Sequence, residues 1–379
     1  MKRTVCLLLL LFLALFCAPC AYAEGVEDFY SEQMQQSGAE DLPDSLPQET
    51  RETLESLGID GVDWQALTSI TPESIFSEIG GMTAEHSQGP LHAAASVVAV
   101  MLLCALCSGM KLSFGDKQLG SVVGMVGALC VCAVVVAPIV SFIQQTADII
   151  HAAAGFLLAC VPVLTGIMLA AGQPVSSGSY HLLMMAAGNV ISIVSAGVLV
   201  PLLNIFLALS IVSAVSPGVN LGGICDAFHK VVKWILGLCM TVFTGLLTVH
   251  SIVASSLDGT AAKAAKFVVS SFVPVVGSAL GEALQTVTGC VKMLKSGIGA
   301  FGLLAGAFIF LPVILQCILW MATLAACEGI GDIFELKEIT SLLKAVSKAL
   351  QIILAIVLCC MTVLTVSTVI MLAIGGGGN

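Results

Sequence analysis

Two short motifs carry the letters of known binding or catalytic sites, but neither has the surroundings that its chemistry needs. Gly297 to Gly302 reads G-I-G-A-F-G, the letters of a dinucleotide-binding loop. Such a loop joins a strand to a helix so that backbone N–H groups reach a pyrophosphate, whereas this one follows a helical segment and opens an apolar run. Gly329-Ile330-Gly331-Asp332 has the Gly-x-Gly-Asp letters of intramembrane aspartyl proteases. That chemistry requires a second aspartate facing Asp332 from another span, and the other aspartates fall at predicted span ends or loops.

Cysteine gives no metal or redox site either, although the chain has 15 cysteines. Cys104 and Cys107 have C-x-x-C spacing, but they lie within an apolar run with no histidine or carboxylate nearby. We expect them to pack as small hydrophobic residues. Residues 24–90 contain no cysteine, so no disulfide framework is expected there. The sequence therefore predicts no catalytic residue, no cofactor and no metal, and a protein that is not an enzyme.

The best-patterned candidate for a functional element is Asp258–Ser296, which lies inside an apolar region. From Pro274 onward, apolar residues recur at spacings of four and three, which predicts one apolar stripe on a helix. Glu282 and other polar residues fall on the other side, facing water, a pore or a partner. We predict a re-entrant or interfacial helical hairpin bent at Pro274, with the Glu282 face toward water or a partner. Its candidate functional residues are Lys263, Lys266, Pro274, Gly277, Gly281, Glu282, Gln285, Lys292 and Lys295.

The composition around this segment indicates an all-α polytopic membrane protein. The chain is 58% hydrophobic and only 10% charged, with a mean hydropathy of +1.05, whereas a soluble domain carries about 25% charged residues. Residues 24–90 hold 15 acidic residues against the single Arg51, while residues 91–379 hold 11 lysines against 9 acids. No basic patch of the kind that binds nucleic acid occurs. The lipid bilayer is the expected surrounding.

The N-terminal part predicts an exported segment. Residues 1–23 read as a cleavable signal peptide, with Lys2 and Arg3 before a short apolar stretch and Ala21-Tyr22-Ala23 as the cleavage site; an uncleaved first membrane helix is the alternative. Residues 24–90 form a short acidic extracytoplasmic segment with short helices, two of them ended by Gly58 and Gly80. Because this segment has few large apolar residues, we expect it to fold onto a partner or onto the membrane body.

Seven apolar runs follow, each long enough to cross a hydrocarbon core of about 30 Å. The fourth run, 182–216, is too long for one crossing and contains Pro201, so it is either one bent helix or a tight hairpin of two helices. The lysine distribution does not decide between seven spans and eight. The runs are roughly 91–110, 119–143, 150–171, 182–216, 231–255, 298–327 and 349–374. They divide into a first part, 91–257, and a last part, 298–379, flanking the amphipathic segment 258–297; an amphipathic connector at 334–350 joins the last two helices.

The whole arrangement resembles stage III sporulation protein AE of endospore-forming Firmicutes. The resemblance rests on the signal peptide, the acidic segment ending in TPESIFSEI, and the block DGTAAKAAKFVVSSFVPVVGSALGEALQTVTGCVKMLKSGIGAFG at 258–302. It implies a polytopic, non-enzymatic subunit of the channel complex that connects mother cell and forespore. Its location would be the mother-cell membrane around the forespore, with residues 24–90 in the intermembrane space.

The resemblance also implies partners. These are the other stage III A-operon proteins, including a secretion-type ATPase, and through them the forespore protein SpoIIQ; a homo-oligomer is left open. Two alternatives from other classes remain, a stand-alone permease for a small solute and an intramembrane aspartyl protease that uses Asp332. Buried ionisable groups are expected in an ion-driven carrier, and the apolar runs contain almost none.

Overall fold

The computed structural model describes residues 34–35, 37–62, 71–111, 118–170, 172–194, 200–215, 222–272 and 277–373. The predicted signal peptide and Pro274 lie outside these residues. The described chain is all-α, as the composition predicts. Its long helices are α5 (Pro72–Lys111), α6 (Gln118–Ala170), α7 (Pro174–Val194), α8 (Val200–Val215), α9 (Gly222–Phe272), α10 (Gly277–Ile333) and α11 (Lys337–Ala373).

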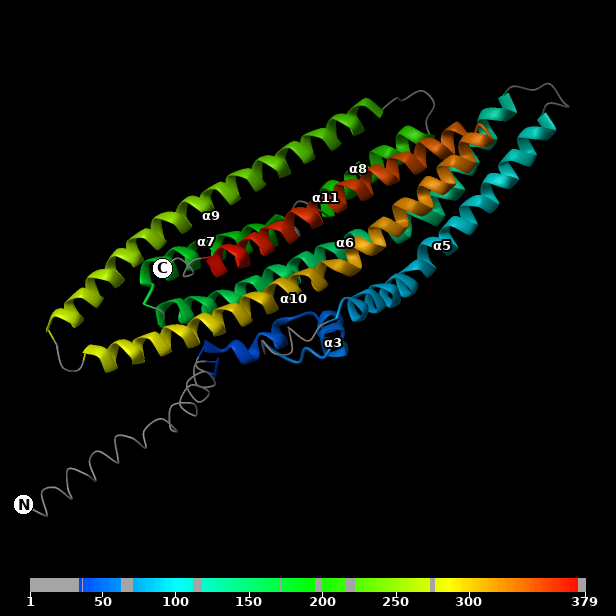
Figure 1. Cartoon of the computed structure of the whole chain (residues 1–379). Helices are drawn as coiled ribbons and strands as arrows, with labels where there is room; N and C mark the ends of the chain where they lie inside the picture. The colour runs from blue at the N-terminus through cyan, green and yellow to red at the C-terminus, as the bar shows by residue number, and fades with distance from the viewer. Residues whose placement is uncertain are drawn as a thin grey trace, which may run out of the picture.

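These helices form an elongated antiparallel bundle in which successive helices run in opposite directions, except for α7 and α8 (Figure 1). Helix α11 is the central element, since it packs against α6, α7, α8, α9 and α10. Helix α9 lies at the edge of the bundle, against α7, α8 and α11. We call the end where α6 passes into α7 the α6–α7 end, and the opposite end, where α10 passes into α11, the α10–α11 end.

The fourth apolar run is a broken helix rather than a hairpin. Helices α7 and α8 follow one another in the same direction, and both pack against α6, α9 and α11 (Figure 1). Pro201 is the second residue of α8, a position where proline loses no helical hydrogen bond.

The expected break between the second and third apolar runs is absent. Helix α6 continues through both of them for 53 residues, or about 80 Å at 1.5 Å per residue. The intervening residues Gln144 to Ile149 include polar side chains but neither glycine nor proline, so nothing in them ends a helix. Among the described residues, five helices are long and apolar enough to cross a membrane, and the predicted count of seven or eight spans is not confirmed.

Glycine lets α10 and α11 approach closely at Gly302 and Gly306, whose spacing of four is typical of helices packed closely in lipid. A Cβ atom at Gly302 would lie 3.3 Å from the Thr368 side chain, and one at Gly306 would collide with Leu364. Elsewhere, a Cβ atom at Gly188 of α7 would lie 2.7 Å from Leu158 of α6. Small residues therefore set the spacing of these helix pairs.

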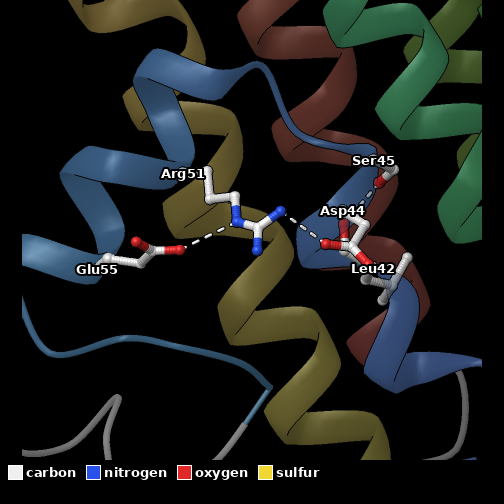
Figure 2. Close-up of polar contacts among 5 residues, drawn as sticks. All are labelled: Leu42, Asp44, Ser45, Arg51 and Glu55. Carbon is white, nitrogen blue, oxygen red and sulfur yellow. Dashed lines mark hydrogen bonds and ion pairs between the residues drawn. The ribbon is translucent and has the colours of Figure 1, made fainter.

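The N-terminal segment folds onto the bundle, as expected from its small number of large apolar residues. It contains the 3-10 helices η2 (Ala39–Asp41) and η3 (Pro43–Ser45) and the helix α3 (Gln48–Ser56), which pack against α6 and α10. Arg51 joins η3 to α3, since its guanidinium lies 2.7 Å from Asp44 and 3.0 Å from Glu55 (Figure 2). The hydrogen bond to Glu55 and the charge of Asp44 raise the pKa of Arg51.

Of the two glycine stops predicted in this segment, one is confirmed and one is wrong. Gly58 follows α3 with φ +78°, and the N–H of Ile59 bonds back to Leu54, which closes the helix. Gly80 does not end a helix, because α5 runs without interruption from Pro72 to Lys111 and passes through Pro90 as well. The boundary at residue 90 thus falls inside a continuous helix.

Helices α10 and α11 are joined by a tight turn at residues 334–336, so the predicted connector 334–350 is this turn plus the start of α11. The N–H of Glu335 bonds to Asp332, and the N–H of Leu336 bonds to Gly331, which is the pattern of a glycine-type helix stop. Glu335 nevertheless occupies the left-handed position, with φ 55°. A side chain at this position strains the backbone.

Candidate functional site

A buried polar contact between distant parts of the chain is made by Asp258, the first residue of the block that carries the family resemblance. Its two carboxylate oxygens accept hydrogen bonds from the backbone N–H groups of Val175, at 3.1 Å, and Ser176, at 2.8 Å. These are among the first four N–H groups of α7, which have no partner inside their own helix. Asp258 is only 4% exposed, so its charge is held by the two donors and by the positive end of α7.

The turn before α7 explains why these N–H groups point at α9. Gly172 has φ +72°, and its N–H bonds to Leu169 while the N–H of Gln173 bonds to Met168. This is the glycine stop that ends α6. It reverses the chain within four residues and presents the start of α7 to Asp258. The helix therefore takes its N-terminal cap from a different helix instead of from a local Ser, Thr, Asp or Asn.

Hydroxyl groups follow on the buried side of α7. Ser177 donates to the Thr165 carbonyl of α6 at 3.0 Å. Ser176 and Tyr180, four residues apart and thus on one helix face, are both buried. Within the described residues, neither the Ser176 hydroxyl nor the Tyr180 hydroxyl has a hydrogen-bond partner, and the same holds for Oε1 of Gln173. Polar atoms buried in this way point to an unseen water or ligand.

Among the nine candidate functional residues of the predicted segment, Lys295 is the one whose side-chain surroundings the structure describes. It is 7% exposed, and no described residue bonds its Nζ. The expectation that Lys295 lies on a polar face turned away from the helix's apolar stripe is therefore wrong. Val291 and Leu294, which belong to that stripe, are buried as predicted. Helix α10 packs against α5, α6, α11 and α3, so more than one of its faces is covered, and Lys295 is buried together with the apolar stripe.

The remaining residues of the segment are only partly placed. Helix α9 extends to Phe272 and α10 starts at Gly277, so Gly277 and Gly281 lie in helical backbone. Pro274 falls outside the described residues, and so do the side chains of Lys263, Lys266, Glu282, Gln285 and Lys292. The bend at Pro274 and the orientation of the Glu282 face stay predictions.

Ion pairs fasten the α10–α11 end. Lys344 of α11 lies 3.5 Å from Asp332 at the end of α10, and Lys348 lies 2.5 Å from Asp226 near the start of α9. Asp332, the residue that the protease motif singles out, is thus a partly exposed carboxylate paired with a lysine. In the part of the chain that the structure describes, no group of His, Cys, Asp or Glu could hold a metal ion.

Sequence reasoning missed the cap and the hydroxyl groups. In the sequence, Asp258 is only the first residue of the block that carries the resemblance. No local pattern around it indicates a contact with residues more than 80 positions earlier. For Ser176 and Tyr180, the available signal was their spacing of four at the start of an apolar helix. That spacing is too common to single out a site without knowledge of burial.

A sequence profile of a known family matches residues 65–375, which include all the helices from α5 to α11. The chain belongs to the stage III sporulation protein AE family. The sequence resemblance is thereby confirmed. The stage III sporulation protein AE of Bacillus subtilis (strain 168) is 24% identical over 206 residues, which make up 54% of this chain and 52% of that protein. The alignment thus spans about half the length of this curated relative. No solved structure matches the chain.

The residues that match the stage III sporulation protein AE family include all the polar groups described at the α6–α7 end. Asp258, Ser176, Tyr180 and Lys295 all lie within residues 65–375, whereas Arg51 and the rest of the N-terminal segment lie before them. The polar contacts at the α6–α7 end therefore lie within the part of the chain that matches this sporulation family.

Proposed function

We propose that this protein is a non-enzymatic integral membrane subunit of a sporulation complex with transport or secretion-like activity that connects mother cell and forespore. The family match over residues 65–375 carries this proposal. The five helices suited to crossing a membrane support it, since a subunit of such a complex has to sit in the bilayer. We place the protein in the mother-cell membrane around the forespore.

The lysine distribution supports one orientation of the bundle. Cytoplasmic loops carry an excess of lysine and arginine. Among the described residues, the parts of the helices toward the α10–α11 end hold six lysines, Lys111, Lys230, Lys233, Lys337, Lys344 and Lys348. The parts toward the α6–α7 end hold four, Lys263, Lys266, Lys292 and Lys295. Six lysines against four favour a cytoplasmic α10–α11 end. Residues 24–90 would then face the intermembrane space, where their acidic surface could meet partners.

The partners of the proposed complex are the other stage III A-operon proteins, with a secretion-type ATPase among them, and indirectly the forespore protein SpoIIQ. Contact with the ATPase would fall to the cytoplasmic α10–α11 end, where the charged start of α11 is exposed. Contact toward the forespore would fall to the acidic N-terminal segment. Co-purification from sporulating cells tests both assignments, and exchange of Lys344 and Lys348 for glutamine should weaken only the first.

A stand-alone permease is the second candidate, and the buried Lys295 is the observation that favours it. Carriers bury ionisable groups that meet their solutes or coupling ions. Purified protein in proteoliposomes separates the two functions. Flux of a solute through this protein alone would support a permease, whereas flux that requires the other operon products would support a subunit role.

Gene deletion with complementation tests the main proposal. Cells without the gene should complete engulfment and then stall in forespore development, and the intact gene should restore heat-resistant spores. Complementation with Asp332→Ala should restore them equally, because a subunit without protease chemistry does not need that carboxylate. Normal spores from the deletion strain would contradict the proposal. If a stably folded Asp332→Ala protein restored no heat-resistant spores, the protease would be favoured instead.

A further inference from the structure

Four of the buried polar atoms that lack a partner in the described residues lie at the α6–α7 end. They are Oε1 of Gln173, the hydroxyls of Ser176 and Tyr180, and Nζ of Lys295. An unpaired ammonium is the costliest of these, since burying a charge without a counter-charge costs more than burying an unpaired hydroxyl. Such a group is retained where something not yet bound supplies the missing interaction.

Two contacts place Tyr180 and Lys295 at one level of the bundle. Ser177 of α7 bonds Thr165 of α6, so Tyr180, three residues further along α7, is level with Pro162 along the bundle axis. The rings of Phe156 in α6 and Phe301 in α10 meet edge to face, with their centroids 6.4 Å apart. Six residues along each antiparallel helix from that contact, Lys295 is also level with Pro162. Because both helices rise 1.5 Å per residue, the coincidence holds to within about one turn.

The contacts between α10 and α11 show what Lys295 faces. Lys295 precedes Gly302 by seven residues, so both lie on the same side of α10. That side meets α11, where Gly302 contacts Thr368 and Gly306 contacts Leu364. Continuing the same register brings Ala373, the last residue of α11, opposite Gly297. Lys295 is therefore directed at the C-terminal end of the central helix, where a positive charge is favoured.

The chemistry of these groups selects the ligand. Lys295 contributes three N–H donors and a positive charge, and Ser176 and Tyr180 each contribute an O–H donor. Among the side chains that the structure describes near these groups, Asp258 is a carboxylate whose oxygens already accept from the N–H groups of Val175 and Ser176. The groups that remain without a partner are thus a cation and hydrogen-bond donors. Oxyanions accept several charge-assisted hydrogen bonds at once and match these groups.

We propose that Lys295, Ser176 and Tyr180 form a binding site for an oxyanion, a phosphate or carboxylate group, at the α6–α7 end of the bundle. The oxyanion belongs either to a small solute or to the headgroup of an anionic lipid. The ammonium neutralises its charge, and the two hydroxyls of α7 orient it. The site is argued from the buried polar atoms and does not rest on the role in sporulation.

The test uses the full-length protein in nanodiscs of phosphatidylcholine and follows its thermal midpoint. Sodium phosphate and sodium acetate are titrated at constant ionic strength, with sodium chloride as the reference. A separate arm replaces part of the lipid by phosphatidylglycerol in a buffer without phosphate. We expect the midpoint to rise saturably in at least one arm, which also tells whether solute or lipid supplies the oxyanion.

Three variants decide whether the response comes from this site. Lys295→Met, which keeps the length of the side chain, should abolish the saturable rise. Tyr180→Phe, which keeps its shape, should weaken the apparent affinity about tenfold, as expected for one lost hydrogen bond to a charged group. Lys230→Met removes an exposed lysine and should respond like the wild type. The proposal is overturned if no probe raises the midpoint saturably, or if both Lys295→Met and Tyr180→Phe respond as the wild type does. Should Lys295→Met fail to fold, Tyr180→Phe alone still decides.

Discussion

The carboxylate of Asp258 on α9 lies 2.8 Å from the backbone nitrogen of Ser176 on α7, and this contact joins the edge helix to the interior of the bundle. A second fastening exists at the other end of α9, where Asp226 meets Lys348 of α11. The two contacts differ in burial, because Asp258 is enclosed whereas Asp226 and Lys348 are partly exposed. They should therefore differ in energy.

Replacing Asp258 by alanine should destabilise the protein by about 1–3 kcal/mol, because two backbone N–H groups would remain buried without an acceptor. The stability of Asp258→Asn should lie between those of the wild type and Asp258→Ala, since an amide offers one acceptor oxygen where the carboxylate offers two. The free energy of unfolding can be measured by titration with SDS. Asp148→Ala, which removes an exposed carboxylate from α6, is the matched control and should change the stability by less than about 0.5 kcal/mol. Equal stabilities for the two alanine variants would contradict the cap.

The Asp226–Lys348 pair should contribute little. Ion pairs between exposed side chains are worth about 0–1 kcal/mol and weaken as salt is added. A double-mutant cycle with Asp226→Asn and Lys348→Gln, run at low and at high salt, measures the coupling directly. A coupling clearly above about 1 kcal/mol that persists at high salt would show that the pair is better shielded from water than its exposure indicates.

Gly306→Ala should cost about 1–3 kcal/mol, because the added methyl group would collide with Leu364 and push α10 away from α11. Shortening the opposing side chain in Gly306→Ala/Leu364→Ala should recover part of that loss. Gly245→Ala is the control, since a Cβ atom there meets nothing within 4 Å. As a plain exchange of glycine for alanine in a helix, it should stabilise the protein by about 0.5–1 kcal/mol. Equal effects at both positions would rule out close α10–α11 packing through glycine.

Glu335→Gly should stabilise the protein by about 1 kcal/mol, because glycine adopts a positive φ without the strain that a Cβ atom causes. The control is Glu335→Ala, which removes the same carboxylate and keeps the Cβ atom. If alanine stabilised the protein as much as glycine, the gain would come from the charge and not from the backbone.

The helical class and the apolar helices could be predicted from sequence because composition alone determines them. Helix ends were harder, as Gly58 and Gly80 show. Gly58 has the left-handed conformation that makes glycine a stop, whereas Gly80 lies within a helix whose next turns are held by packing, with Met82 buried. Both positions hold glycine, and tertiary packing decides whether the helix ends there or continues.

The predicted number of spans is not confirmed, and the reason is related. Gln144 and Asp148 interrupt the apolar pattern of α6, but an interruption in polarity does not break a helix unless the backbone conformation changes as well. Lys295 was expected on an exposed polar face but is buried. The apolar stripe of a helix predicts the direction of one contact surface only. A helix surrounded by neighbours, as α10 is, buries polar positions too.

The origin of the α7 cap has a consequence for the order of biosynthesis. Asp258 is made 82 residues after Ser176, the residue whose N–H it holds. A nascent chain leaves the ribosome from its N-terminus. The first turn of α7 must therefore enter the membrane with its amide groups bound to water or to the insertion machinery, and α7 can settle only after most of α9 has been translated. Truncated nascent chains that end before Asp258 should leave the α6–α7 turn open to proteases, and chains that extend through α9 should protect it.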